Sequence, residues 1–97
     1  MTNDKRERIL RDAVSTYGET AQITKAIEEL CELSHALCRY QNALLFGKLD
    51  ELHVRDVHYE MADVQIMLDQ LRLMFGDCAE EETFKLERLA RILALPR

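Results

Sequence analysis

Two short acidic phrases in this chain place carboxylates at a spacing that suits metal binding. Glu28, Glu29 and Glu32 form the first phrase, and Glu60 and Asp63 form the second. On an α-helix, residues three positions apart lie on adjacent turns of one face. Two such faces opposite each other would repel unless cations lie between them. Because all the donors are oxygens, the sequence predicts a Mg²⁺ site, with Mn²⁺ as the alternative ion.

Glu60 stands within an apolar helical pattern. At about 100° per residue, Val57, Val64 and Leu71 fall on the same broad face as Glu60, and Asp63 falls at its edge. A charged carboxylate in an apolar face is unfavourable unless it is paired or bound to metal. A solvated helix surface does not explain this position, so Glu60 is the strongest ligand candidate.

Four helical segments must position these carboxylates. Helices are predicted over residues 3–17, 20–40, 50–75 and 79–95, and the second and third carry the acidic phrases. Gly18 and Gly76 are typical of helix ends, Asp50 is a typical N-cap, and Pro96 stops the last segment. The connection between the second and third helices should include residues 41–42 and 46–48.

The second segment carries an apolar face beside a polar ridge. The residues expected in its core face are Ile23, Ala26, Ile27, Leu30, Leu33 and Leu37. The ridge consists of Gln22, Lys25, Glu29 and Glu32, with Glu28 farther towards solvent. The third segment has a second apolar strip at Ala62, Ile66 and Leu73, almost opposite the first. A helix apolar on two sides is typical of an oligomer interface, so a homo-oligomer is expected.

Length and composition favour one all-α domain over residues 1–97, resembling a four-helix bundle completed by oligomerisation. The chain is 47% hydrophobic, with three Gly and one Pro. A net charge of −5 argues against a general nucleic-acid binder. The charged start of the chain and the lack of a long apolar run predict a cytoplasmic protein without a membrane segment. Cys31, Cys38 and Cys78 lack metal-site spacing and are expected to be buried free thiols.

The combined pattern resembles a known family. Gln22, Lys25, Glu28-Glu29 and Glu32-Leu33, followed after 27 residues by Glu60-x-x-Asp63-Val64, are similar to the signature of the MazG-like, all-α nucleoside triphosphate pyrophosphohydrolases. Residues 60–76 look especially like the short members, which phages and prophages often carry. Residues 85–89 of the last segment add to the likeness, which covers about residues 15–92.

This resemblance implies an activity and roles for the acidic residues. Members of the family hydrolyse the bond between the α- and β-phosphates of a nucleoside triphosphate, releasing a monophosphate and pyrophosphate. Carried over to this chain, the signature makes Glu29, Glu32, Glu60 and Asp63 the Mg²⁺ ligands. Glu28 or Glu32 is then the candidate for accepting a proton from the attacking water.

The resemblance also suggests substrate-binding residues. Lys85 and Arg88 match basic positions that contact phosphates in some members, although Leu89 stands where larger relatives have a further Arg. Lys25 would touch a phosphate or balance the carboxylates, and Gln22 would bond to a base or sugar or simply mark a polar boundary. The aromatic candidates for stacking on the base are Tyr40, Phe46 and Tyr59.

Two other functions fit parts of the sequence. Glu32 and His35 form one copy of the Glu-x-x-His phrase of di-iron bundles, but such sites need it twice and Asp63 occupies the second position. A non-catalytic helical interaction module would also carry many acidic residues on solvated faces. Neither the preferred base and sugar nor the choice between dimer and tetramer follows from the sequence.

Overall fold

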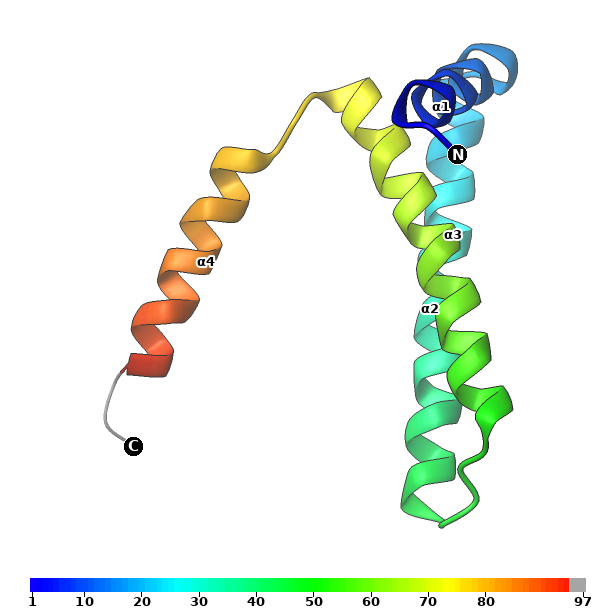
Figure 1. The fold of residues 1–97 in the computed structure, drawn as a ribbon, viewed down its shortest axis with the longest axis vertical. Coiled ribbons are helices and arrows are strands. Elements are labelled where there is room, and N and C mark those ends of the chain that lie inside the picture. Colours follow the sequence, from blue (N-terminus) through cyan, green and yellow to red (C-terminus); the bar gives the residue numbers. More distant parts are fainter. Residues whose placement is uncertain (95–97) are drawn as a thin grey trace.

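The computed structural model describes residues 1–94, which form four helices and no strand (Figure 1). The helices are α1 (Asn3–Tyr17), α2 (Glu19–Leu45), α3 (Glu51–Phe75) and α4 (Ala79–Ala94). The predicted all-α fold class is therefore confirmed for the described part of the chain. No helix in residues 1–94 is both long and apolar enough to cross a bilayer.

The central unit is an antiparallel hairpin of α2 and α3 (Figure 1). Helix α1 packs against both hairpin helices at the end where α2 begins and α3 ends. Helix α4 leaves the end of α3 and packs against none of the other three helices. Only α1, α2 and α3 therefore build the core of the single chain.

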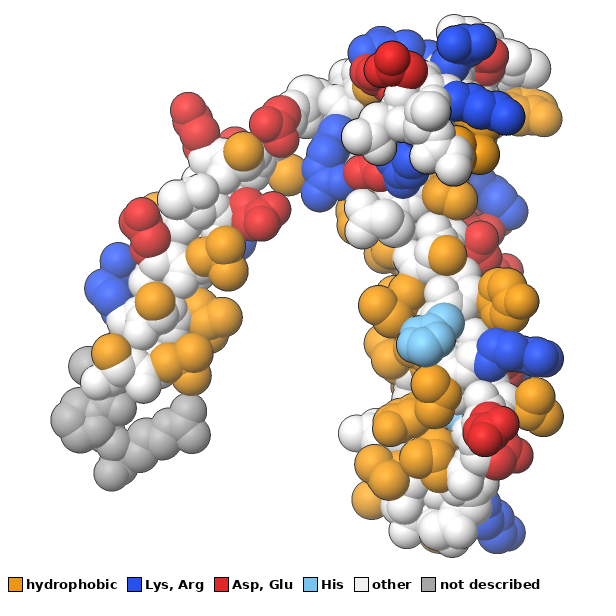
Figure 2. Space-filling view, in the orientation of Figure 1, with side chains coloured by type: hydrophobic (Ala, Val, Ile, Leu, Met, Phe, Trp, Pro, Cys, Tyr) orange, Lys and Arg blue, Asp and Glu red, His pale blue; other side chains and the backbone are white. Residues whose placement is uncertain are grey.

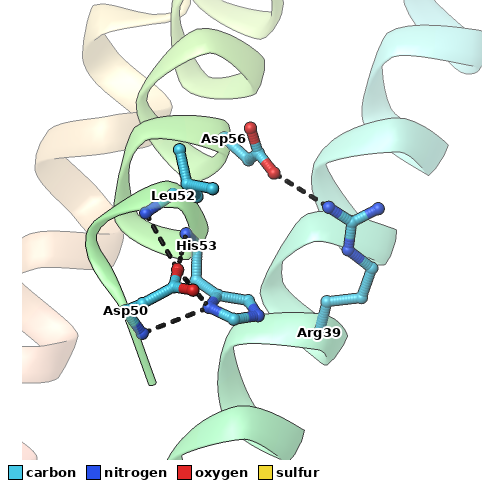
Figure 3. A network of polar contacts seen from close by, with 5 residues as sticks. All are labelled: Arg39, Asp50, Leu52, His53 and Asp56. Atoms are coloured by element: carbon cyan, nitrogen blue, oxygen red, sulfur yellow. Dashed lines mark hydrogen bonds and ion pairs between the residues drawn. The ribbon is translucent and has the colours of Figure 1, made fainter. Parts of the chain in front are cut away.

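Local capping signals place most helix ends where the sequence predicts them. The Asp50 carboxylate accepts hydrogen bonds from the backbone N–H groups of Leu52 (2.9 Å) and His53 (3.2 Å). The Asp50 N–H in turn donates to His53 Nδ1 at 3.3 Å, which completes a capping box (Figure 3). Gly18 and Gly76 follow α1 and α3 with φ of 88° and 92°, a region that favours glycine.

The predicted end of α2 at Tyr40 is wrong. The helix continues to Leu45, so Gln41 and Asn42 are helical and do not belong to the connection. Ala43 is buried, and this burial continues the contact face by one further turn. The end of α4 is described to Ala94; the predicted stop at Pro96 lies outside the described residues.

The buried face of α2 also differs from the predicted apolar face. Its buried residues are Gln22, Ala26, Glu29, Ala36 and Ala43, whose spacings of four, three, seven and seven residues follow the heptad repeat of paired helices. Ile27, Leu30 and Leu37 are instead exposed in the single chain. The small alanine side chains allow close approach to α3, and that orientation turns part of the polar ridge inward.

The predicted burial of the three thiols is wrong as well. Cys31, Cys38 and Cys78 are all exposed. Cys31 and Cys38 lie roughly opposite the buried face of α2 at about 100° per residue, and Cys78 lies between α3 and α4. An apolar neighbourhood in the sequence therefore did not indicate burial here.

Asp69 connects α1 to α3. Its Oδ2 forms an ion pair with Arg6 of α1, and its Oδ1 accepts bonds from Arg72 (2.8 Å) and Gln65 (3.2 Å). Burial raises the pKa of Asp69, but the hydrogen bond and charge of Arg6, with Gln65 and Arg72, outweigh that effect and lower it overall. Together with the buried Leu10, this contact holds α1 on the hairpin.

We expect Asp69→Asn to lower the free energy of unfolding by about 1 kcal/mol near neutral pH, since the lost ion pairs are partly exposed. A carboxylate whose pKa is lowered by folding stabilises the protein above its unfolded pKa, and this contribution is lost as the pH falls through the folded pKa. Denaturant unfolding of both proteins between about pH 3 and pH 7 measures the difference. Asp12→Asn, at an exposed position of α1, is the control. A difference that stays constant over this range would contradict the assigned role.

Candidate metal centre

The hairpin brings four carboxylates together across the contact between its helices. One oxygen each from Glu29 and Glu32 of α2 and from Glu60 and Asp63 of α3 lies within 4.8 Å of all the others. The spacing of three on each helix is what makes this convergence possible, because it places both acids of each helix on one face. These are the four residues to which the sequence assigned metal ligation.

Two of these carboxylates hold buried oxygens without a partner. Glu29 is only 5% exposed, and Glu60 is half-buried. Among the described residues, Oε2 of Glu29 and Oε2 of Glu60 are the buried side-chain atoms that form no hydrogen bond. Buried acceptors left in this way are unfavourable, so a cation bound among them would remove a cost of the folded state.

Lys25 supplies a positive charge at the cluster. Lys25 Nζ lies 2.9 Å from Glu29 Oε1, one turn away on α2. The hydrogen bond to Glu29 and the charge of Glu29 raise the pKa of Lys25, so its ammonium stays protonated. Arg39 is engaged elsewhere, because its Nη2 lies 2.8 Å from Oδ2 of Asp56 (Figure 3). In the described part of the chain, a single ammonium is therefore paired with the four carboxylates.

The two α3 carboxyls of the cluster have raised pKa values, in part because the other carboxylates repel their charged forms. Burial raises the pKa of Glu60, and the charges of Glu32, Asp63 and Glu29 raise it further. Burial also raises the pKa of Asp63, to which the charge of Glu29 adds and the charge of Lys25 is opposed. The cluster thus favours either a bound proton or a bound cation.

Two hollows adjoin the cluster from opposite ends. The first has a volume of about 520 Å³ and includes Glu28, Glu29 and Asp63 in its wall. The second, of about 470 Å³, is lined by Glu32 and Glu60 together with the Arg39–Asp56 pair. Both volumes fall in the range of small-molecule sites. An extended ligand could therefore cross the carboxylates with one part in each hollow.

Some of the other predicted site residues lie beside the four carboxylates, and others lie away from them. Gln22, Lys25 and Glu28 line the first hollow with part of the cluster, and Glu28 is exposed there. Lys85 and Arg88 lie on α4, which packs on no other described helix, so the single chain does not bring them to the carboxylates. His35 lines the second hollow but is not one of the four converging groups.

The first hollow contains residues that the sequence analysis missed. Gln70 is buried and accepts a hydrogen bond from Gln22 Nε2 at 2.7 Å. In the sequence, Gln70 is an uncharged polar residue within the apolar pattern of α3. Glu60 interrupts the same pattern with a charge, and that interruption is what made it a ligand candidate. Tyr17 also lines this hollow. The aromatic candidates Tyr40 and Phe46 line other hollows instead.

No model of a known protein family matches the chain, and no curated protein or solved structure shows significant similarity to it. The likeness to MazG-like enzymes therefore depends on the motif residues themselves.

We expect Glu60→Gln to raise the melting temperature of the metal-free protein near neutral pH. Because folding raises the pKa of Glu60, its ionised form destabilises the folded state, and this destabilisation grows as the pH rises through the folded pKa. The advantage of the amide should shrink as the pH falls towards the ordinary carboxyl pKa of about 4, below which Glu60 is protonated in the folded and the unfolded state alike.

Thermal unfolding in the presence of a chelator, from about pH 4 to about pH 8, tests this expectation. Glu51→Gln makes the same change at an exposed position of α3 and should show no such pH-dependent gain. A Glu60→Gln protein less stable than wild type at neutral pH would contradict the view that the cluster is strained without a cation.

Proposed function

We propose that this protein is a Mg²⁺-dependent nucleoside triphosphate pyrophosphohydrolase. It would cleave ribo- or deoxyribonucleoside triphosphates between the α- and β-phosphates to a monophosphate and pyrophosphate, in the cytoplasm. The observation that carries the proposal is the set of four converging carboxylates with two buried, unpartnered oxygens beside a ligand-sized hollow. The resemblance of the motif residues to the MazG-like signature supports this reaction over other metal-dependent hydrolyses.

The donor set fits a hard divalent cation. Glu29, Glu32, Glu60 and Asp63 offer only carboxylate oxygens, which suit Mg²⁺ or Mn²⁺ and disfavour thiolate-selective metals. When bound, such an ion would neutralise triphosphate charge and lower the pKa of a coordinated water. The unpaired oxygens of Glu29 and Glu60 are the atoms that gain most from such binding.

The chain itself supplies the groups that handle protons and orientation. Glu28 is exposed in the wall of the first hollow and is not one of the converging carboxylates, so it is the better placed to accept a proton from water. Glu32 is the alternative, with one oxygen in the cluster. Lys25 holds Glu29 through its 2.9 Å contact, which favours a role in balancing the carboxylates over one in gripping phosphate.

The enzyme is proposed to work as a homo-oligomer. Leu30, Leu37 and Leu44 of α2 are exposed at seven-residue intervals, the repeat of a second helix-packing seam. Met61 of α3 is exposed too, as are the apolar residues of α4. Hydrophobic side chains gather along the hairpin side that faces α4 and along the α4 side that faces the hairpin (Figure 2). A second copy would cover these faces.

Oligomerisation would also give Lys85 and Arg88 a role. Because α4 packs on no helix of its own chain, its contacts must come from elsewhere if it is to be buried. Docked on the hairpin of a partner, α4 would carry two basic side chains to the proposed phosphate site. Without such docking, Lys85 and Arg88 do not reach the carboxylate cluster.

The central experiment incubates the protein with Mg²⁺ and a panel of nucleoside triphosphates, and separates the products by chromatography. We expect monophosphate and pyrophosphate, and a loss of activity of about 100-fold or more in Glu60→Gln, because one metal ligand is removed. Glu51→Gln, the matched exposed change, should retain activity.

Lack of turnover by a folded sample, or full activity of Glu60→Gln, would contradict the proposal. Iron uptake with oxidation would favour a di-iron protein instead.

A second prediction concerns assembly. Leu37→Glu should shift the protein to a smaller species in sedimentation velocity, since it places a charge in the proposed seam at a side chain that is 48% exposed in the single chain. Ser15→Glu, at an exposed position of α1, should leave the sedimentation coefficient unchanged. A wild-type protein that is monomeric at high micromolar concentration would contradict the homo-oligomer.

A further inference from the structure

The first hollow has a floor of two buried amides. Gln22 is 8% exposed and Gln70 is 4% exposed, and Nε2 of Gln22 donates to Oε1 of Gln70 at 2.7 Å. This bond uses one donor and one acceptor of the pair. Oε1 and the second N–H of Gln22 remain, as do the two N–H donors of Gln70, and neither side chain forms another side-chain hydrogen bond among the described residues.

The surroundings of the amide pair suit a flat heterocycle. Ile66 and Met67 supply apolar wall, and Tyr17, an exposed aromatic residue, also lines the same hollow of about 520 Å³. Most small-molecule sites combine such apolar walls with a few fixed polar groups that set orientation. An aromatic ring at the mouth can stack on the face of a base while the amides meet its edge.

The distance from the pair to the carboxylates matches one nucleoside. Gln22 precedes Glu29 by seven residues, and Gln70 follows Asp63 by seven residues on the antiparallel partner helix. Two helical turns correspond to about 10 Å. That is the approximate distance from the pairing edge of a base to its 5′-phosphate, so a base on the amides would leave its α-phosphate beside the carboxylates.

From these observations we propose that the Gln22–Gln70 pair is the nucleobase subsite and determines base preference. This inference rests on the proposed function for its substrate, and it concerns the part of the first hollow that lies beyond the four converging carboxylates. It assigns the nucleoside end to the first hollow and therefore the β- and γ-phosphates to the second, where Arg39 lies.

The chemistry of the pair explains what preference it allows. If both amide groups rotated by half a turn, Gln70 would donate to Gln22 and the bond between them would be kept. The free acceptor would then lie on Gln70 and the free donor on Gln22. The pair can therefore match bases with either order of donor and acceptor, and the wild type should discriminate weakly among bases. A carboxylate at position 70 can only accept, and the guanine edge is the one that offers two adjacent donors, N1–H and N2–H.

The test compares wild type, Gln70→Met and Gln70→Glu in steady-state hydrolysis of the four common nucleoside triphosphates. Gln70→Met keeps the side-chain volume but removes the bonds, and should raise KM about tenfold for every base. It should weaken inhibition by the monophosphate product similarly but leave inhibition by pyrophosphate unchanged, because only the monophosphate carries a base. Gln70→Glu should shift the preference towards guanine about tenfold.

Gln41→Met, the same change at an exposed site of α2, is the control for substitution itself. Equal changes in monophosphate and pyrophosphate inhibition by Gln70→Met would overturn the subsite, as would an unchanged base profile in Gln70→Glu. If wild type hydrolyses no nucleotide, side-chain amide signals in NMR provide an independent readout. Shifts of the Gln22 and Gln70 NH₂ signals on adding nucleoside monophosphate would keep the base subsite while the proposed activity fails, and unmoved signals would overturn both.

Discussion

Repulsion among four carboxylates across one helix–helix contact is the constraint on which this structure depends. Glu29 and Glu32 of α2 meet Glu60 and Asp63 of α3, and within residues 1–94 only the ammonium of Lys25 is paired with one of them. Apolar burial elsewhere along the hairpin must offset this cost, and α1 adds a further anchor through Asp69. The helices alone position these four carboxylates, so a cation that bound there would meet a preorganised set of oxygens.

The helix ends and the acidic cluster were the parts most accessible from sequence. Gly18, Asp50 and Gly76 have strong local preferences, and α1 and α3 follow them closely. Glu60 was recognisable because its charge contradicts the apolar pattern around it. The end of α2 was missed because Gln41 and Asn42 resemble a connection when read locally, whereas burial of Ala43 against the hairpin extends the helix.

The orientation of α2 could not be obtained from hydrophobicity. Its Ile and Leu residues outweigh its alanines in any hydrophobic profile, yet the alanines are buried and Ile27, Leu30 and Leu37 are exposed. Helix α2 has an alanine face and a leucine face, and only the three-dimensional packing shows that the alanine face contacts α3. Gln70 escaped notice for a related reason, since a neutral amide breaks an apolar pattern less visibly than a carboxylate.

The alanines of the α2 seam carry a consequence for ion selectivity. Ala26 stands one turn before Glu29 and Ala36 one turn after Glu32, so methyl groups bracket the carboxylates on both sides. The separation of the two backbones at the cluster is therefore set by the smallest side chains of the contact. A wider ion with longer metal–oxygen bonds would have to push these helices apart. For the proposed metal site, discrimination by ionic radius would then depend on the packing beside the carboxylates, and a single added methylene there would change it.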